Sequence, residues 1–198
     1  VEEAIETLLE FVEAGKQVIC TGCLVSRYGP ELLDEIPELV LVAGPGSYGG
    51  IREALDKQAK YLAPRFDTVV SRSLFSTRAS AYVKISEGCS NHCGFCLIPR
   101  LRGELLSKPE TEIVDECRRL IDAGARELIL IGQDLGSYGR DRGALALPQL
   151  LEQLAELSGL EWLRVMYIHP ETLTPEMLAL IGGHERICSY LDMPIQHV

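Results

Sequence analysis

The sequence predicts an α/β protein in which a partial, open βα barrel follows part of a parallel-sheet α/β domain. Two observations favour this class. Short apolar strands alternate with amphipathic helices along nearly the whole chain, a pattern typical of parallel sheets joined by crossover helices. The composition is that of a globular protein, with 46% hydrophobic and 24% charged residues in a chain of 198. We therefore expect one or two small domains with packed cores.

The first 61 residues alternate between helices and strands. Apolar residues recur at helical spacing in residues 2–14, and Gly15 follows as a helix end. The pattern predicts, in order, a helix at 2–14, a strand at 18–21, a helix at 31–36, a strand at 39–43 and a helix at 51–61. Because this order begins with a helix, we expect a strand to precede it. Residues 62–80, rich in serine and arginine, predict a linker with room for a hairpin.

Residues 81–198 predict a second series of βα units. The expected strands are 81–86, 127–131, 162–168 and 189–193, and the expected helices are 110–123, 147–157 and 175–181. The helix at 110–123 carries the clearest apolar stripe, made by Ile113, Val114, Cys117, Leu120 and Ile121. Four strands cannot close an eight-stranded barrel, so we expect an open sheet that stops at the fourth strand.

The charge and the cysteines exclude several classes of protein. With 19 basic and 29 acidic residues the net charge is −10, which argues against a broad nucleic-acid-binding face and suits a basic protein partner. The acidic N-terminus resembles neither a signal nor a transit peptide, so we expect a soluble, cytoplasmic protein without membrane contact. Seven cysteines, an odd number, disfavour a disulfide framework and indicate metal or redox chemistry.

Three cysteines form the pattern that carries the chemistry. Cys89, Cys93 and Cys96 are spaced C-x3-C-x2-C directly after the first strand of the second series. This position is the carboxyl end of a strand, where the active sites of α/β proteins collect. A 4Fe-4S cluster normally takes four thiolates, so three would leave one iron open to an exogenous ligand. The alternatives are a zinc loop and three unrelated thiols.

This pattern resembles the radical S-adenosylmethionine enzymes, and its surroundings resemble their methylthiotransferase family. The segments Tyr82–Cys89 and Phe95–Pro99 carry the family resemblance. Ile131–Gly139 and Tyr190–His197 are similar to the branch that modifies an aspartate of a ribosomal protein. The tRNA-modifying branch tends to have asparagine at the position of Asp134. The resemblance covers essentially the whole chain.

The resemblance implies a domain organisation and two metal centres. Residues 1–61 would be a partial N-terminal methylthiotransferase domain, 62–80 a linker, and 81–198 the radical S-adenosylmethionine core, truncated at its fourth strand. Cys23 matches the last of three cysteines that hold a second, auxiliary 4Fe-4S cluster in this family. The other two would lie upstream, so we expect an internal piece of a longer protein, inactive by itself.

The implied reaction adds a methylthio group to the β-carbon of an aspartate in small-subunit ribosomal protein twelve. S-adenosyl-L-methionine bound at the open iron would be cleaved to a radical that abstracts hydrogen there, with an electron donor such as flavodoxin supplying the electron. Gln133, Asp134 and Arg164 are candidate contacts to S-adenosylmethionine, with structural polar packing as their alternative role. The basic residues Arg100, Arg102 and Lys108 would orient substrate or the cofactor carboxylate, or lie in a solvated loop. Two other functions stay open: a tRNA adenosine methylthiotransferase, and a non-catalytic zinc-binding interaction module.

Overall fold

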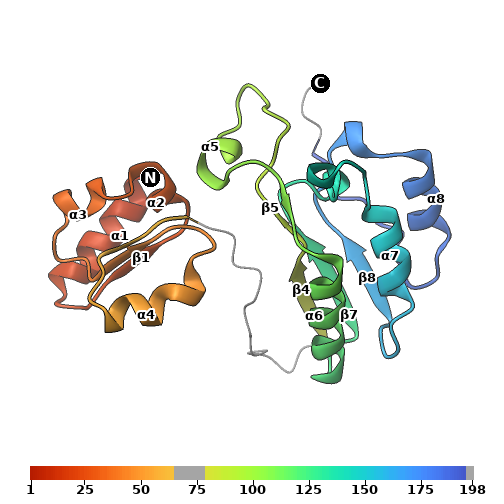
Figure 1. Cartoon of the computed structure of the whole chain (residues 1–198), viewed down its shortest axis with the longest axis horizontal. Coiled ribbons are helices and arrows are strands. Elements are labelled where there is room, and N and C mark those ends of the chain that lie inside the picture. The colour runs from red at the N-terminus through yellow and green to blue at the C-terminus, as the bar shows by residue number, and fades with distance from the viewer. Residues whose placement is uncertain (65–78, 195–198) are drawn as a thin grey trace. The chain divides into compact units, whose positions relative to one another are not determined.

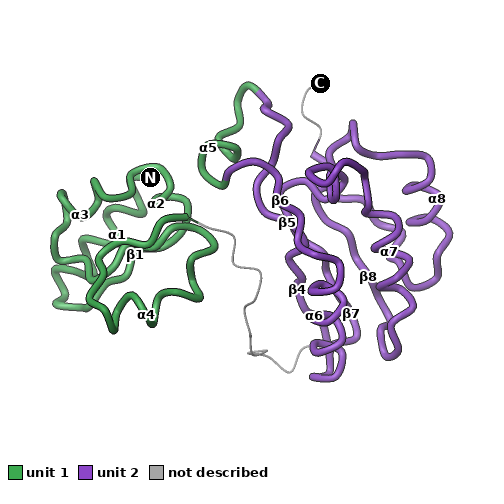
Figure 2. The backbone as a smooth tube through the Cα atoms, in the orientation of Figure 1, with its two compact units in different colours: residues 1–70, 94–102 green, residues 71–93, 103–198 purple. Residues whose placement is uncertain are grey.

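A computed structural model describes residues 1–64 and 79–194 of the chain (Figure 1). The predicted linker at 62–80 therefore lies largely outside the described residues. The chain divides into two compact units, one of Val1–Val70 with Gly94–Arg102 and the other of Ser71–Cys93 with Gly103–Val198 (Figure 2). The unit boundary thus crosses the cysteine loop after Cys93. None of the helices in the described ranges combines the length and the apolar character that crossing a membrane requires.

The first unit is built on a three-stranded parallel sheet in the order β1-β2-β3. Its strands are β1 (Ile19–Thr21), β2 (Leu41–Ala43) and β3 (Tyr61–Leu62), and its helices are α1 (Glu2–Glu13), α2 (Cys23–Tyr28), α3 (Glu31–Glu35), α4 (Ile51–Asp56) and α5 (Ile98–Arg102), with the short 3₁₀ turn η1 (Tyr48–Gly50). Alternate residues of β2 face opposite sides of the sheet. Val42 joins the core beneath α1–α3, whereas Leu41 and Ala43 pack with Ala54 of α4. Helices therefore cover both faces, as expected for parallel strands.

The second unit contains a parallel sheet in the order β4-β7-β8 and a small antiparallel pair, β5 with β6. The strands are β4 (Ser80–Lys84), β5 (Ser86–Glu87), β6 (Leu106–Ser107), β7 (Glu127–Ile131) and β8 (Trp162–Val165), and the helices are α6 (Glu110–Asp122), α7 (Leu147–Ala155) and α8 (Pro175–Gly183), with 3₁₀ turns η2 (Leu135–Ser137), η3 (Arg140–Arg142) and η4 (Pro170–Thr172). One core joins a single face of the sheet to α6, α7 and α8 (Figure 1). The opposite face carries Tyr82 and Trp162, which are 57% and 52% exposed.

The predicted α/β class, with parallel sheets and an open βα series, is confirmed. All five apolar residues of the stripe predicted in α6 are buried. The helix expected over 51–61 is too long, because it ends at Asp56 and Gln58 turns into the left-handed region with φ 54°. Tyr61 and Leu62 instead add β3 beside Val42 and Ala43.

The strand predicted at 189–193 is wrong. Beyond β8 the described residues make a single parallel bridge, Leu163 to Ile187, rather than a ladder. The Tyr190 N–H turns back to donate to the Cys188 carbonyl at 2.7 Å, which interrupts the extended run. The backbone nevertheless stays close to the segment that follows β8, because the Ile168 N–H donates to the Asp192 carbonyl at 3.0 Å.

Candidate functional site

The carboxyl ends of β4, β7 and β8 lie at one edge of the sheet. The register pairs Lys84 with Ile131 and Leu130 with Val165, so the three strands finish nearly level. The loops that follow them are residues 85–97, 132–138 and 166–172. This is the edge at which parallel α/β sheets bind their ligands. The cysteine loop, Gln133 and Asp134 are therefore all found where the sequence predicts a site.

The start of the cysteine loop is held against residues 103–105. The Cys89 N–H donates to the Gly103 carbonyl at 3.2 Å, and the Leu105 N–H donates to Ser90 Oγ at 3.0 Å. Gly88 has a φ of +73°, and a Cβ there would lie 2.2 Å from the Glu104 carbonyl oxygen. Only glycine fits this close backbone approach, so Gly88 fixes the direction in which the chain enters the loop.

The three loop cysteines are partly exposed, and none of them forms a disulfide in the described part of the chain. Partly exposed thiols on one short loop are a chemically suitable donor set for an iron–sulfur cluster. Cys96 Sγ also accepts a hydrogen bond from the Ile98 N–H, at 3.5 Å, at the start of α5. Within the described ranges, however, no three His, Cys, Asp or Glu side chains converge in a metal-binding arrangement. The three thiols lie on one loop, with Cys89 and Cys93 in the second unit and Cys96 in the first.

Cys23, the predicted auxiliary-cluster ligand, begins α2 in the first unit and is partly exposed. Within that unit α2 packs against α5, and α5 begins two residues after Cys96. Segments that are far apart in the sequence and carry Cys23 and Cys96 therefore lie next to each other.

Asp134 and Gln133 differ in what surrounds them. The Asp134 carboxylate is 2% exposed and accepts hydrogen bonds from Asn91 Nδ2 at 2.8 Å, Ser137 Oγ at 2.6 Å and the His169 N–H at 3.3 Å. Its donors all come from the protein. Gln133 Oε1 is buried and has no hydrogen-bond partner among the described residues. Of these two residues, both predicted cofactor contacts, Gln133 is thus the one whose side-chain oxygen lacks a partner in the described part of the chain.

Arg164 contacts residues away from the carboxyl edge of the sheet. Its Nε donates to Glu127 Oε1 at 2.9 Å, and its guanidinium lies 5.1 Å from the centre of the Tyr190 ring. The hydrogen bond to Glu127 holds the pKa of Arg164 above its ordinary value. Because Glu127 begins β7, this contact draws the guanidinium away from the edge that carries the cysteine loop. Its predicted role as a cofactor contact stays a prediction.

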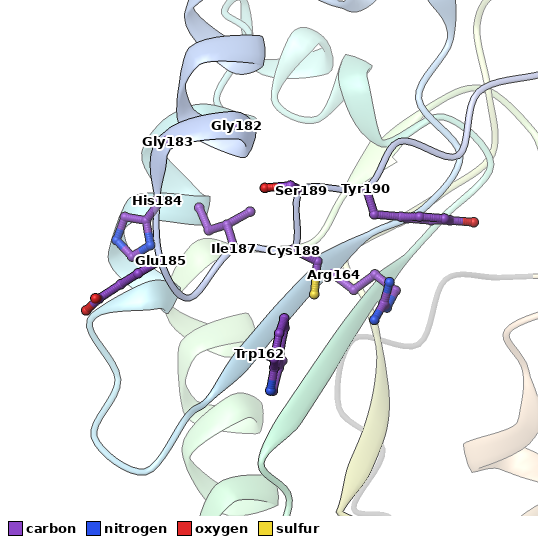
Figure 3. A pocket seen from close by; sticks show the side chains of 10 residues that line it. All are labelled: Trp162, Arg164, Gly182, Gly183, His184, Glu185, Ile187, Cys188, Ser189 and Tyr190. Atoms are coloured by element: carbon purple, nitrogen blue, oxygen red, sulfur yellow. The ribbon is translucent and has the colours of Figure 1, made fainter.

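Arg164 also lines a pocket of about 550 Å³ beside β8. Trp162 and Cys188 lie next to it in the close view (Figure 3). Burial raises the pKa of the Cys188 thiol, whereas the nearby Arg164 charge lowers it. Sequence reasoning does not connect these residues, because they are brought together by the bridge from Leu163 to Ile187, a contact between segments that the chain pattern does not reveal.

The basic residues near the cluster loop separate into two environments. Arg100 is exposed, but Lys108 is only 8% exposed, and its Nζ lies 2.5 Å from Glu116 Oε2 of α6. Tyr138 Oη donates to the Lys108 carbonyl at 2.8 Å. Lys108 is therefore a packed structural residue. The prediction that it lies in a solvated loop is wrong.

Asn91 is the functional candidate that sequence reasoning missed. It lies inside the C-x3-C spacing, where only the cysteines drew attention, and its partner Asp134 follows far along the chain. The one available signal was that Asp134 follows closely after a strand that neighbours the strand before the loop.

Comparison with known proteins places this site in a family. Residues 83–198, more than half of the chain, match the model of the radical SAM superfamily. The chain is 44% identical over its whole length to the ribosomal protein uS12 methylthiotransferase RimO of Syntrophus aciditrophicus, covering 48% of that protein. It is 40% identical over 99% of its length to the RimO of Clostridioides difficile, covering 47% of it. The chain thus spans about half the length of the curated relatives it matches.

A solved structure of the radical S-adenosylmethionine methyltransferase TsrM from Kitasatospora setae, with cobalamin and a 4Fe-4S cluster bound, aligns with a TM-score of 0.46 and 16% identity. That alignment covers 59% of this chain and 22% of TsrM. The family match begins at residue 83, within β4, and contains all three loop cysteines. On the extent of that match, the chain belongs to the radical SAM superfamily.

Proposed function

We propose that this chain is part of a radical S-adenosylmethionine methylthiotransferase that modifies an aspartate of ribosomal protein uS12. The observation that carries the proposal is the 38–44% identity to RimO proteins over almost the whole chain, including both units. The C-x3-C-x2-C loop at the carboxyl edge of the sheet supports it, because three thiolates would leave one iron of a 4Fe-4S cluster open to S-adenosylmethionine. A methylthio group would be added at the β-carbon of the aspartate.

Cys89, Cys93 and Cys96 would hold a 4Fe-4S cluster, and Cys23 would contribute to a second cluster in the longer protein. When bound, the first cluster supplies the electron that cleaves S-adenosylmethionine and so makes possible attack on an unactivated C–H bond. The chain itself would hold and shield the reactants. Gln133 supports this role because its side-chain oxygen is buried at the site edge and has no hydrogen-bond partner within residues 1–64 and 79–194, as an acceptor for the methionine amino group would be.

The surface charge supports a basic substrate. A chain with net charge −10 would attract a cationic ribosomal protein and orient it before contact. Such a substrate would place the enzyme in the cytoplasm. An electron donor of the flavodoxin type would complete the reaction, because the cluster must be reduced in every cycle.

Transfer of a labelled methyl group tests the proposal. The full-length protein that contains this chain is incubated, reduced and without oxygen, with methyl-labelled S-adenosylmethionine and either ribosomal protein uS12 or tRNA. Label on the ribosomal protein, lost in Cys93→Ala and kept in Cys117→Ala, is the expected result. Cys117 is a matched control because it is buried in the α6 core. Label on tRNA alone, or bound zinc with no label, would contradict the proposal.

A further inference from the structure

The Asp134 carboxylate joins three separate segments of the second unit. Its donors are Asn91 of the cysteine loop, Ser137 of η2, and the backbone of His169 after β8. A carboxylate that is 2% exposed is stable only when protein donors replace its water. The three bonds meet that need without a ligand. Asp134 is thus a junction where the cysteine loop meets the carboxyl ends of β7 and β8.

Asn91 is the residue that reaches this junction from the loop. It lies between Cys89 and Cys93, two residues from each. Cys89 and Ser90 are tied to residues 103–105, and Asn91 ties the next position to the sheet edge. His92 then adopts a φ of +50°, a left-handed conformation that redirects the chain just before Cys93. The position of Cys93 therefore depends on where Asn91 is held.

We propose that Asp134 is a positioning residue for the cluster loop, acting through Asn91 and without touching the cofactor. A hydrogen bond from a neutral amide to a buried carboxylate is among the stronger ones in proteins. Losing it would raise the population of displaced loop conformations about tenfold or more. The hydrogen bonds that hold the loop are features of the structure and do not depend on any function. Only the use of the loop's thiols for a cluster rests on the proposed function.

Thiol reactivity in the metal-free chain tests the loop directly. Alkylation rates of Cys89, Cys93 and Cys23 are followed by mass spectrometry in the parent chain and in Asn91→Ala, Asp134→Ala and the double variant. We expect each single variant to speed alkylation of Cys93 about tenfold, with no further increase in the double variant and no change at Cys23. Glu127→Gln is the matched control, because Glu127 is a partly buried carboxylate at the opposite end of β7 from the loop that carries Asp134. It should leave all three rates unchanged.

An exchanged pair separates positioning from simple loss of stability. In the Asn91→Asp, Asp134→Asn double variant the amide and the carboxylate trade places, so one donor still faces one acceptor. We expect this variant to restore most of the slow alkylation of Cys93, while Asp134→Asn alone is fast. Asn91→Ala and the Glu127→Gln control each weaken one hydrogen bond of a carboxylate, so both should lower the thermal unfolding midpoint by a similar small amount, whereas only Asn91→Ala should speed alkylation of Cys93. Additive effects of the two alanine variants, or no change at Cys93, would overturn the proposal.

Iron release after reconstitution extends the test to the loaded loop. Iron is removed by a chelator, and its rate of loss is followed by the fading of the cluster absorbance. We expect Asn91→Ala and Asp134→Ala to release iron several-fold faster than the parent and the Glu127→Gln control. Equal release rates would overturn the positioning role in the loaded protein. A parent chain that takes up no iron would contradict the proposed function instead, and the thiol rates would still decide whether Asp134 positions the loop.

Discussion

Gly88 determines how the chain enters the cysteine loop. It combines a φ of +73° with a backbone contact that leaves no space for a Cβ, 2.2 Å from the Glu104 carbonyl oxygen. Gly88→Ala would have to move backbone on both sides of the contact. We expect it to lower the free energy of unfolding by about 2 kcal/mol or more, measured by urea titration.

The matched control is Gly94→Ala, further along the same loop. A Cβ at Gly94 meets no atom within 4 Å, and its φ lies outside the left-handed region. Its unfolding free energy should stay within about 0.5 kcal/mol of the parent value. Equal effects of the two substitutions would show that the contact with Glu104 does not restrict the loop.

Lys108 belongs to a mostly buried ion pair with Glu116. The side chains are 10% and 13% exposed, and the two charges lie 2.5 Å apart. Lys108→Met would leave a buried carboxylate without this cation, so we expect a loss of about 3 kcal/mol in unfolding free energy. Arg118→Met on the exposed face of α6, where Arg118 is 62% exposed, should cost less than about 0.5 kcal/mol. A Lys108→Met chain as stable as the Arg118→Met chain would contradict this account.

Tyr138 links the loop after β7 to the segment that follows β6. Its hydroxyl donates to the Lys108 carbonyl, and burial raises its pKa to about 12. In the unfolded chain the pKa is about 10, so between these values the folded state keeps a proton that the unfolded state has lost. Stability is therefore unaffected below about pH 10 and falls by roughly 2 kcal/mol as the pH rises toward 12.

Urea titrations between pH 8 and 11.5 measure this effect. Tyr138→Phe removes the titrating group and should flatten that part of the decline, although it starts from lower stability because the Lys108 carbonyl loses its donor. A parent chain and a Tyr138→Phe chain with the same slope above pH 10 would show that Tyr138 is not the group responsible.

At the scale of elements, long periodic segments could be predicted from the sequence and short ones could not. The stripe from Ile113 to Ile121 predicts α6 because every member faces one core. The helices α2 and α5, with six and five residues, are too short for a stripe to be recognised. The strand expected at 189–193 failed because its apolar residues favour a strand, whereas the turn at Tyr190 is set by a backbone hydrogen bond.

The candidate site was predicted unevenly for a similar reason. The spacing of Cys89, Cys93 and Cys96 is local, so the sequence reveals it. The partners of Asp134 come from Asn91 and His169, which only the parallel sheet brings to one edge. Lys108 was predicted near the cluster from its sequence neighbours, but its burial depends on Glu116 across the fold.

At the scale of the whole molecule, the net charge of −10 bears on substrate capture. If acidic side chains attract a cationic ribosomal protein, the attraction is screened by salt over about 10 Å at 0.1 M. We expect the KM for the ribosomal protein to rise several-fold between 50 and 300 mM salt, with kcat little changed. The KM for S-adenosylmethionine serves as the internal control. A salt-independent KM for the ribosomal protein would contradict an electrostatic contribution.

The proposed chemistry requires that the cysteine loop holds a cluster with one iron open to S-adenosylmethionine. Anaerobic reconstitution of the chain, followed by iron and zinc counting and electron paramagnetic resonance, measures this. We expect about four irons per chain at the loop, lost in Cys93→Ala and kept in Cys117→Ala, and a spectrum that changes when S-adenosylmethionine is added. Bound zinc with no cluster signal, or a cluster spectrum indifferent to S-adenosylmethionine, would contradict it.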